Sequence, residues 1–276
     1  MSKTLYLIDG FAQIFRAYYA IRNGMQSPVT GEPTHAVFGF TGMLLKLFNE
    51  LKPDYVVVAV DAPGKTFRDE MYSEYKATRD ETPADLTAQI PRVFELVEGF
   101  GVPVIGKEGL EADDVIATIT EKVLNDPNCH DVRIRIVSRD KDLEQLIGER
   151  VTLYDIHKDE EIDEATLWEK RGVKPHQVID LLALVGDTAD NVPGVPGIGP
   201  KTAAKLVQEY GGIDGLLENI DEIKGKRREN LEAAKETLPL ARTLVTLKRD
   251  GDVPFDLESA KTGRIDVQKL LSLFQQ

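Results

Sequence analysis

Cysteine, histidine and long apolar runs are scarce in this sequence. Its 276 residues contain one cysteine, Cys129, and four histidines. A single cysteine excludes an internal disulfide framework and is typical of a reducing cytoplasm. The histidines are scattered, without zinc-ligand spacing to Cys129. No stretch approaches the roughly 18 to 20 apolar residues that cross a bilayer, and the N-terminus lacks a signal-peptide pattern, so we expect a cytoplasmic protein without a membrane partner.

Positive charge is also in deficit, with a formal net charge of −13. Nucleic-acid-binding proteins usually present a basic surface, so this balance argues at first against such a partner. The basic residues are grouped, however: Lys65/Arg68/Lys76/Arg79, Lys201/Lys205, Lys224/Lys226/Arg227/Arg228 and Lys248/Arg249. Such groups are usually solvated helix faces, and they indicate DNA binding only if they border a catalytic site.

The first part of the chain, residues 1–172, alternates apolar runs with segments of helical periodicity. The apolar runs are short and rich in β-branched residues, which is typical of buried strands. Strands of this kind alternating with helices predict an α/β fold with a parallel sheet covered on both faces. The expected strands are Leu5–Ile8, Tyr55–Val60, Val102–Ile105, Ile134–Val137 and Val151–Tyr154, and the expected helices include residues 38–51, 86–100 and 115–124.

After residue 172 the strand pattern disappears. Glycine and proline divide the remaining residues, 173–276, into segments with apolar positions three and four residues apart, which predicts an all-helical region. The expected helices are Val178–Val185, Lys201–Tyr210, Ile213–Leu217, Arg227–Thr237 and Leu240–Leu247.

Three expected strands end in an aspartate. Asp9 follows the first strand, Asp61 the second, and Asp140 comes just after Ile134–Ser138. Ligands of open α/β sheets bind beyond the carboxyl ends of the strands, so we expect the three side chains to meet there. One such aspartate is often a turn or capping residue, but three at one edge repel each other unless cations compensate their charge.

Further acidic residues occur at close spacing. Glu111, Asp113 and Asp114 begin the helix expected at 115–124, where helix capping explains one or two acids but does not require three. Asp142 lies two residues after Asp140.

Asp187 and Asp190 complete the set of nine acids, and they would face one side of a helix. Because the set supplies only oxygen ligands, it favours a hard cation, Mg²⁺ with Mn²⁺ as a substitute. Two such ions can activate a water and stabilise the leaving oxygen of a phosphodiester. If bound cations neutralised these acids, most of the negative excess of the chain would disappear.

The motifs LYLIDG, VVAVDAPGKTFR, YKATR, EADDVIAT, DKDLEQL and GDTADNVPGVPGIGPKTA occur in this order. From about Leu5 to about Leu247 the chain closely resembles the 5′ nuclease domain of bacterial DNA polymerase I, in the wider flap-endonuclease family. The resemblance implies a PIN-like nuclease core with a helical arch, followed by a helix-hairpin-helix DNA-binding region. It also implies a bacterial, structure-specific 5′ nuclease, a 5′-3′ exonuclease and 5′-flap endonuclease acting in replication and repair beside a fused or separate DNA polymerase.

The resemblance implies roles for matching residues. One metal is expected among Asp9, Asp61, Glu111 and Asp113 with Asp114 close by, and a second among Asp140, Asp142, Asp187 and Asp190. Arg16 is implied near the scissile phosphate. One position departs from the family pattern, because relatives usually carry a small residue where this chain has Arg139. Two outcomes are open: strand alternation turns that side chain away from the site, or Arg139 alters metal affinity.

Residues 62–83 are polar, charged and weakly periodic, and they are too long for an ordinary connection. The resemblance places the arch here, with Tyr75, Lys76 and Arg79 beside the 5′ strand. If residues 76–79 are helical, Lys76 and Arg79 face one side and contact the phosphate as catalytic cations, while Tyr75 offers a ring on which an unpaired base stacks.

Residues 194–202 contain a glycine-rich turn. Pro200 separates Gly199 from Lys201 and a helix precedes the turn, so it does not fit a phosphate-binding P-loop. It fits a helix-hairpin-helix, in which backbone N–H groups at the second helix contact a DNA phosphate. The resemblance adds a K⁺ held by hairpin carbonyls. The expected DNA-binding residues here are Gly194, Gly197, Gly199, Lys201, Thr202 and Lys205.

The expected substrate is DNA with a 5′ flap, a nick or a free 5′ end. RNA–DNA primers are expected as well, since no motif reads bases or a 2′-hydroxyl. Two other classes remain open. A metal-dependent phosphatase for small molecules would not need the hairpin lysines, and a non-catalytic DNA-structure-binding module would not need all nine acids.

Overall fold

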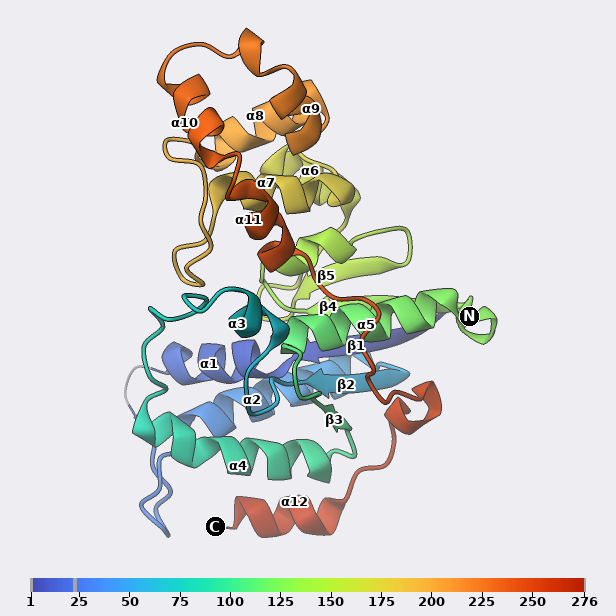
Figure 1. The fold of residues 1–276 in the computed structure, drawn as a ribbon. Helices are drawn as coiled ribbons and strands as arrows, with labels where there is room; N and C mark the ends of the chain where they lie inside the picture. The colour runs from blue at the N-terminus through green and yellow to red at the C-terminus, as the bar shows by residue number, and fades with distance from the viewer. Residues whose placement is uncertain (1, 22–23, 276) are drawn as a thin grey trace.

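The computed structural model describes residues 2–21 and 24–275. Its centre is a six-stranded sheet in the order β3-β2-β1-β4-β5-β6, in which only the β5–β6 pair is antiparallel (Figure 1). The strands are β1 Lys3–Asp9, β2 Tyr55–Ala59, β3 Val104–Ile105, β4 Val132–Val137, β5 Val151–Asp155 and β6 Glu160–Ile162. The expected parallel α/β sheet is therefore confirmed, with β6 as an additional edge strand.

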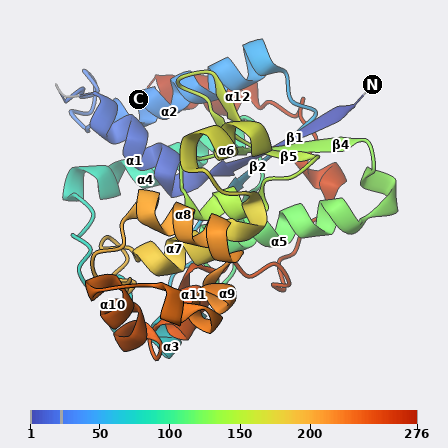
Figure 2. The ribbon, with the colours of Figure 1, turned by 90° about the horizontal axis from the view of Figure 1, so that it is seen from above.

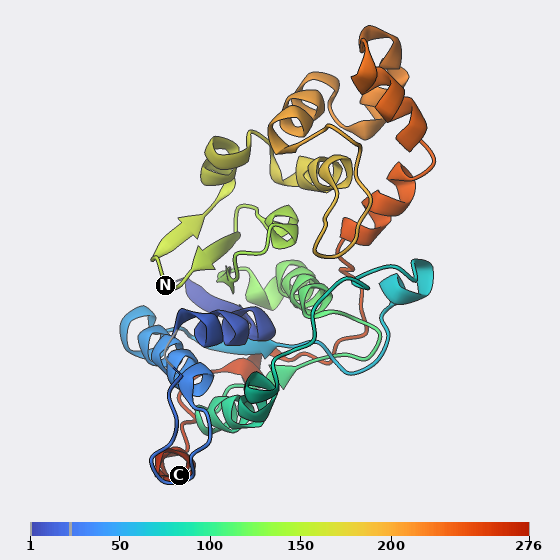
Figure 3. The same ribbon diagram turned by 90° about the vertical axis from the view of Figure 1, so that its left-hand side faces the viewer.

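Both faces of the sheet are buried, because side chains of the central strand β1 alternate between two hydrophobic cores. Leu5 and Leu7 belong to the core that includes helix α5, whereas Tyr6 and Ile8 belong to the core formed with α1, α2 and α4. Figure 3 shows these helices on the two sides of the sheet. The layer helices are α1 Gly10–Ala20, α2 His35–Lys46, which continues as a π-helical turn over Leu47–Leu51, α4 Ala84–Gly99 and α5 Ala112–Asn125.

A helical region follows the sheet. Figure 2 shows α7 and α8 side by side in this region, with α10 and α11 nearby. Its helices are α6 Glu164–Arg171, α7 Val178–Val185, α8 Pro200–Tyr210, α9 Ile213–Glu218, α10 Lys226–Ala234 and α11 Leu238–Val245. No helix in the described ranges is long and apolar enough to cross a bilayer.

The end of the chain does not stay with the helical region. Helix α12, Val267–Phe274, packs against α4 at the far end of the α/β layer (Figure 1). The backbone N–H of Asp266 donates to the carbonyl of Gly99 at 2.8 Å. A Cβ atom on Gly99 would lie 2.6 Å from Leu270 Cδ2, so the glycine allows the close approach. The last helix of the region expected to be helical and DNA-binding, residues 173–276, therefore packs on the α/β layer.

Candidate active site

Three acidic residues emerge at the same edge of the sheet because β1 lies between β2 and β4. The last residue of β1, Asp9, pairs in register with Ala59 of β2, and its neighbour Ile8 pairs with Val137 of β4. Asp61 and Asp140 follow these two strands within three residues. Asp9 accepts hydrogen bonds from the N–H of Ala12 at 3.2 Å and from Ser138 Oγ at 3.0 Å, which fix its carboxylate at the start of α1.

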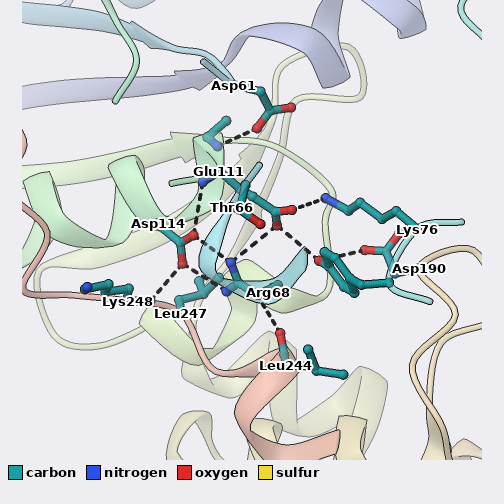
Figure 4. Close-up of polar contacts among 12 residues, drawn as sticks. Asp61, Thr66, Arg68, Lys76, Glu111, Asp114, Asp190, Leu244, Leu247 and Lys248 are labelled. Atoms are coloured by element: carbon teal, nitrogen blue, oxygen red, sulfur yellow. Dashed lines mark hydrogen bonds and ion pairs between the residues drawn. The ribbon is translucent and has the colours of Figure 1, made fainter. Parts of the chain in front are cut away.

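The start of α5 joins this edge through Asp61. Asp61 Oδ1 accepts the N–H of Ala112 at 2.7 Å, which brings the first turn of α5 against the end of β2 (Figure 4). Glu111 lies directly before this turn. Its Oε1 accepts Lys76 Nζ at 2.6 Å and its Oε2 accepts the hydroxyl of Tyr75 at 3.1 Å. Residues of the expected arch thus contact an expected metal ligand.

The carboxylates perturb one another's ionisation. Burial raises the pKa of Asp113 well above its usual value, and the charges of Asp9, Asp140 and Asp142 add to this effect. Burial likewise raises the pKa of Asp9 to about 6 against two opposing hydrogen bonds, with Asp140 and Asp61 adding to the increase. Burial and the charge of Asp140 raise the pKa of Asp142 to about 7. A shared negative potential of this kind is the environment that a bound cation would relieve.

Four of the nine acids have cationic partners. Besides Lys76 with Glu111 and Arg68 with Asp114, Arg79 Nε donates to Asp190 Oδ1 at 3.0 Å, and Lys141 forms an ion pair with Asp187. Lys141 lies between two expected metal ligands in the sequence, and sequence analysis did not assign it. No three His, Cys, Asp or Glu side chains within the described ranges are arranged as they stand to hold a metal ion. The all-oxygen donor set and its uncompensated charge nevertheless fit a hard divalent cation.

Asp187 and Asp190 lie in a loop, so the conditional expectation of a helix is wrong. Gly186, with φ at +71°, ends α7, and Asp187 pairs with Val192 in an isolated antiparallel bridge. Within this turn Asp187 Oδ1 accepts the N–H groups of Ala189 at 2.7 Å and Asp190 at 3.3 Å. The loop still brings Asp190 to the arch, because the carbonyl of Asp190 accepts the N–H of Lys76 at 2.9 Å.

The arch is only partly helical. Its helix α3 covers Phe67–Met71, and residues 73–78 form turns. Lys76 has a left-handed backbone with φ at +54°, so the expected helix over residues 76–79 is wrong. Tyr75 is 6% exposed, with its ring in the core and its hydroxyl on Glu111. In this conformation the ring is not available for an unpaired base, contrary to expectation.

Arg16 forms no hydrogen bond or ion pair with any of the nine acids within the described residues. Its Nη1 forms an ion pair with Asp155 Oδ1 at 2.9 Å, and Arg139 Nε reaches Asp155 Oδ2 at 3.2 Å. Asp155 ends β5 and is 3% exposed. It is a fourth strand-terminal aspartate, and the sequence pattern could have found it, because Asp155 directly follows an expected strand just as Asp9 does. Arg139 is therefore held by Asp155, and its nearest charged partner is not an expected metal ligand.

Asp114 is not placed as a metal ligand. It is 0% exposed, and its two carboxylate oxygens bind the Arg68 guanidinium at 2.6 and 2.9 Å. The expectation of a ligand close to the first metal is therefore corrected for this residue. Arg68, grouped by sequence with surface cations, is likewise buried.

The glycine-rich turn connects α7 to α8, which begins at Pro200 as expected. Gly197 has φ at +77°, and a Cβ atom on Gly194 would lie 2.2 Å from the carbonyl oxygen of Val185. The N–H of Thr202 donates to the carbonyl of Gly199 at 3.0 Å, so this expected phosphate donor is used inside the turn. The other expected contacts are two exposed lysines of α8 that have no ion-pair partner in the described part of the chain, Lys201 and Lys205.

Comparison with known proteins identifies the family. Residues 4–172 match the 5′-3′ exonuclease N-terminal resolvase-like domain, and residues 173–268 match the 5′-3′ exonuclease C-terminal SAM fold. The chain is 39% identical over 274 residues to a 5′-3′ exonuclease of Aquifex aeolicus, covering 99% of this chain and 92% of that protein. It is 43% identical over 262 residues to DNA polymerase I of Rhizobium leguminosarum, covering 92% of this chain but 25% of the polymerase.

A solved structure is similar as well. The structure described as divalent metal ions (zinc) bound to T5 5′-exonuclease superposes with a TM-score of 0.71 and 26% identity, covering 89% of this chain and 90% of that one. The chain belongs to the 5′-3′ exonuclease family. The expected family, the PIN-like core with a helical second region and the nuclease class of the enzyme are confirmed.

The raised pKa of Asp142 predicts how the metal-free protein responds to pH. Its folded-state pKa of about 7 lies above the ordinary 3.8, so between these values the folded protein binds more protons than the unfolded one. Stability from this group therefore rises as the pH falls through that window and is lowest above it. Asp142→Asn removes the buried charge and should stabilise the metal-free protein near pH 8 by about 1 kcal/mol, or about 2 to 4 °C in Tm.

Thermal unfolding in EDTA near pH 5.5 and pH 8 measures this difference. The gain from Asp142→Asn should shrink at the lower pH, where Asp142 of the wild type is protonated. Glu161→Gln, an exposed acid on β6, is the matched control and should change Tm little at either pH. A variant no more stable than wild type near pH 8 would contradict the predicted repulsion.

Proposed function

We propose that this chain is a structure-specific 5′ nuclease that hydrolyses DNA phosphodiesters with two Mg²⁺ ions, for which Mn²⁺ can substitute. The observation that carries the proposal is the convergence of carboxylates from β1, β2, β4, α5 and the 186–199 loop at one edge of the sheet. The raised pKa values of Asp9, Asp113 and Asp142 indicate a negative potential that the protein's own cations leave partly uncompensated. The metal-bound T5 exonuclease, similar in fold and sequence, supports a divalent cation here.

Eight acids would hold the metals. The set around the first ion is Asp9, Asp61, Glu111 and Asp113, and the set around the second is Asp140, Asp142, Asp187 and Asp190. When bound, such ions lower the pKa of a water and stabilise developing charge on a phosphodiester. The protein itself orients the ligands, through Ser138 and Ala12 on Asp9 and through Ala112 on Asp61.

The arch would supply cations to the substrate. Lys76 and Arg79 rest on Glu111 and Asp190 in this structure, and movement of the arch would transfer them to a phosphate of a seated 5′ strand. Tyr75 would become available for base stacking by the same movement. Arg16, held by Asp155, would contact the strand from the α1 side of the site, and this role also stays a proposal.

The α7–α8 hairpin would bind the duplex by its backbone. Lys201 and Lys205 are exposed one turn apart on α8, a spacing that fits successive contacts with a phosphate backbone. Carbonyls of the hairpin would hold a K⁺ ion. The substrate would be DNA with a 5′ flap, nick or free 5′ end, and RNA–DNA primers as well. We infer a bacterial cytoplasmic enzyme that works beside a fused or separate DNA polymerase, since the chain matches about a quarter to a third of the length of DNA polymerase I relatives.

One assay separates this function from the alternatives. A labelled 5′-flap duplex and a nucleoside monophosphate are each incubated with the protein, with and without Mg²⁺. Metal-dependent release of short 5′ fragments from the flap supports the nuclease. Hydrolysis of the monophosphate alone would indicate a phosphatase, and flap binding without cleavage would indicate a non-catalytic module.

The metal assignment predicts the effect of removing one ligand. Asp140→Ala or Asp187→Ala should reduce turnover by about 10²-fold or more, while duplex affinity stays within a few-fold, because metal ligands act mainly on the transition state. Single-turnover cleavage and binding to one flap substrate measure both quantities. Glu161→Ala removes an exposed carboxylate as a control. Near wild-type cleavage by either site variant would show that the acid is not a ligand.

The arch assignment predicts a rate effect at Lys76. Lys76→Ala should lower the single-turnover rate about 10²-fold, the scale of losing a transition-state electrostatic contact, with a much smaller loss of flap affinity. Lys170→Ala, which removes an exposed lysine of α6, should leave the rate unchanged. If the Lys76 variant cleaved within about three-fold of the wild-type rate, the arch would cover the site without acting on the phosphate.

The hairpin assignment predicts a change in salt dependence. Lys201→Ala or Lys205→Ala should weaken binding to all DNA sequences about equally and reduce the slope of log affinity against log salt by roughly one unit per lost contact. The slope is measured by fluorescence anisotropy across a salt series, with Lys269→Ala on α12 as the control. An unchanged slope would assign these lysines to the solvated face of α8.

A further inference from the structure

Arg68 is a fully buried cation at the base of the arch, with 2% of its side chain exposed. Its guanidinium binds Asp114 with two parallel hydrogen bonds, Nη1 to Oδ2 at 2.6 Å and Nη2 to Oδ1 at 2.9 Å. Nη1 also reaches Glu111 Oε2 at 3.4 Å. Nε donates to the carbonyl of Leu244 at 2.7 Å and Nη2 to that of Thr246 at 3.0 Å. All donors of the planar fork therefore have acceptors.

Three distant segments meet at this guanidinium (Figure 4). Arg68 belongs to α3 of the arch, Asp114 to the first turn of α5, and the two carbonyls to the end of α11. The last carbonyls of a helix have no hydrogen-bond donors within the helix, and at the end of α11 Arg68 provides these donors. Asp114 extends the junction, since its Oδ1 also accepts the N–H of Lys248 at 2.8 Å. The helical region is thereby tied to the edge of the sheet.

The Arg68–Asp114 pair contacts Glu111 at two points, its backbone and its carboxylate. Asp114 Oδ2 accepts the backbone N–H of Glu111 at 3.1 Å, which fixes the backbone from which that carboxylate extends. Nη1 of Arg68 contacts the Glu111 carboxylate directly. The other cation on Glu111, Lys76, is 23% exposed and belongs to the moving part of the arch in the proposed function. Arg68 is the partner that stays when Lys76 leaves.

We propose that Arg68 is a positioning residue that, through Asp114, holds Glu111 in place for metal binding. The inference rests on the proposed function, in which Glu111 is a metal ligand. Stability alone does not explain the pair, because a buried ion pair contributes little net stability relative to apolar residues of similar volume. Residues that orient a metal ligand typically change metal affinity about 10- to 100-fold when removed.

A double variant separates positioning from stability. Arg68→Met alone would leave the buried Asp114 carboxylate without a cation and destabilise the fold. Arg68→Met/Asp114→Leu removes both charges and fills the space with apolar atoms, so folding is expected to persist. Mn²⁺ affinity, measured by calorimetric titration, should fall about 10- to 100-fold. The kcat for flap cleavage should fall at least as much, while KM stays within about three-fold because flap binding does not require Glu111.

Arg68→Lys is measured in parallel, because it keeps the buried positive charge but loses the fork that reaches Asp114, Glu111 and α11 together. The Arg68→Lys variant should also bind Mn²⁺ about ten-fold more weakly. If the double variant fails to fold, the Mn²⁺ affinity and kcat of Arg68→Lys test the positioning role instead. The matched control is Arg242→Met/Asp180→Leu, which removes an Arg–Asp pair with an Nε–Oδ1 distance of 2.8 Å between α11 and α7. The control should keep Mn²⁺ affinity.

Wild-type flap cleavage is established first, so that the two hypotheses fail separately. Absence of cleavage by the wild type would overturn the proposed function. Normal wild-type cleavage, together with Mn²⁺ affinity and kcat of the folded variants within about three-fold of wild type, would overturn the positioning role of Arg68 and leave the pair as a structural contact only.

Discussion

Repulsion among carboxylates at one edge of the sheet is the constraint on which the rest of this structure depends. Asp9, Asp113 and Asp142 all have pKa values raised by burial and by neighbouring acids, so the site is costly to ionise. Such a set persists only if rigid elements fix it from several directions. Here β1, β2 and β4 deliver one part of it, α5 a second, and the 186–199 loop a third.

Cations of the arch compensate part of this negative charge. Lys76 and Arg79 neutralise Glu111 and Asp190, so the groups proposed to contact a phosphate also stabilise the site before a substrate arrives. A cation bound at Glu111 would compete with Lys76 for the same oxygen atoms. In the proposed function, metal occupancy and the position of the arch would therefore be linked through this one carboxylate, which Arg68 also contacts.

Sequence patterns predicted what local chemistry determines. The apolar runs located β1 to β5, and the strand-end positions located Asp9, Asp61 and Asp140. Strand β6, with the sequence Glu-Glu-Ile, carries no apolar pattern, and its pairing with β5 depends on a tertiary neighbour. The left-handed backbone of Lys76 likewise has no local signal, since it follows from contacts with a loop more than a hundred residues away.

Asp113 and Asp114 mark the limit of sequence reasoning most clearly. They are adjacent, of the same residue type and in the same helical turn, yet about 100° of helix rotation separates their side chains. Asp114 meets Arg68, which lies 46 residues earlier in the chain, whereas Asp113 meets only other acids. Asp155 is likewise buried against an arginine, and although burial opposes the effect, the hydrogen bond from Arg16 lowers the pKa of the Asp155 carboxyl. The sequence does not separate a structural carboxylate from a proposed metal ligand, because the difference lies in what each side chain meets in the fold. Asp114 and Asp155 are buried against arginines, whereas Asp9 and Asp113 lie among other acids, where a bound metal ion would compensate the negative charge. Glu111, Asp187 and Asp190 lie between these cases, since they are proposed ligands that also have cationic partners.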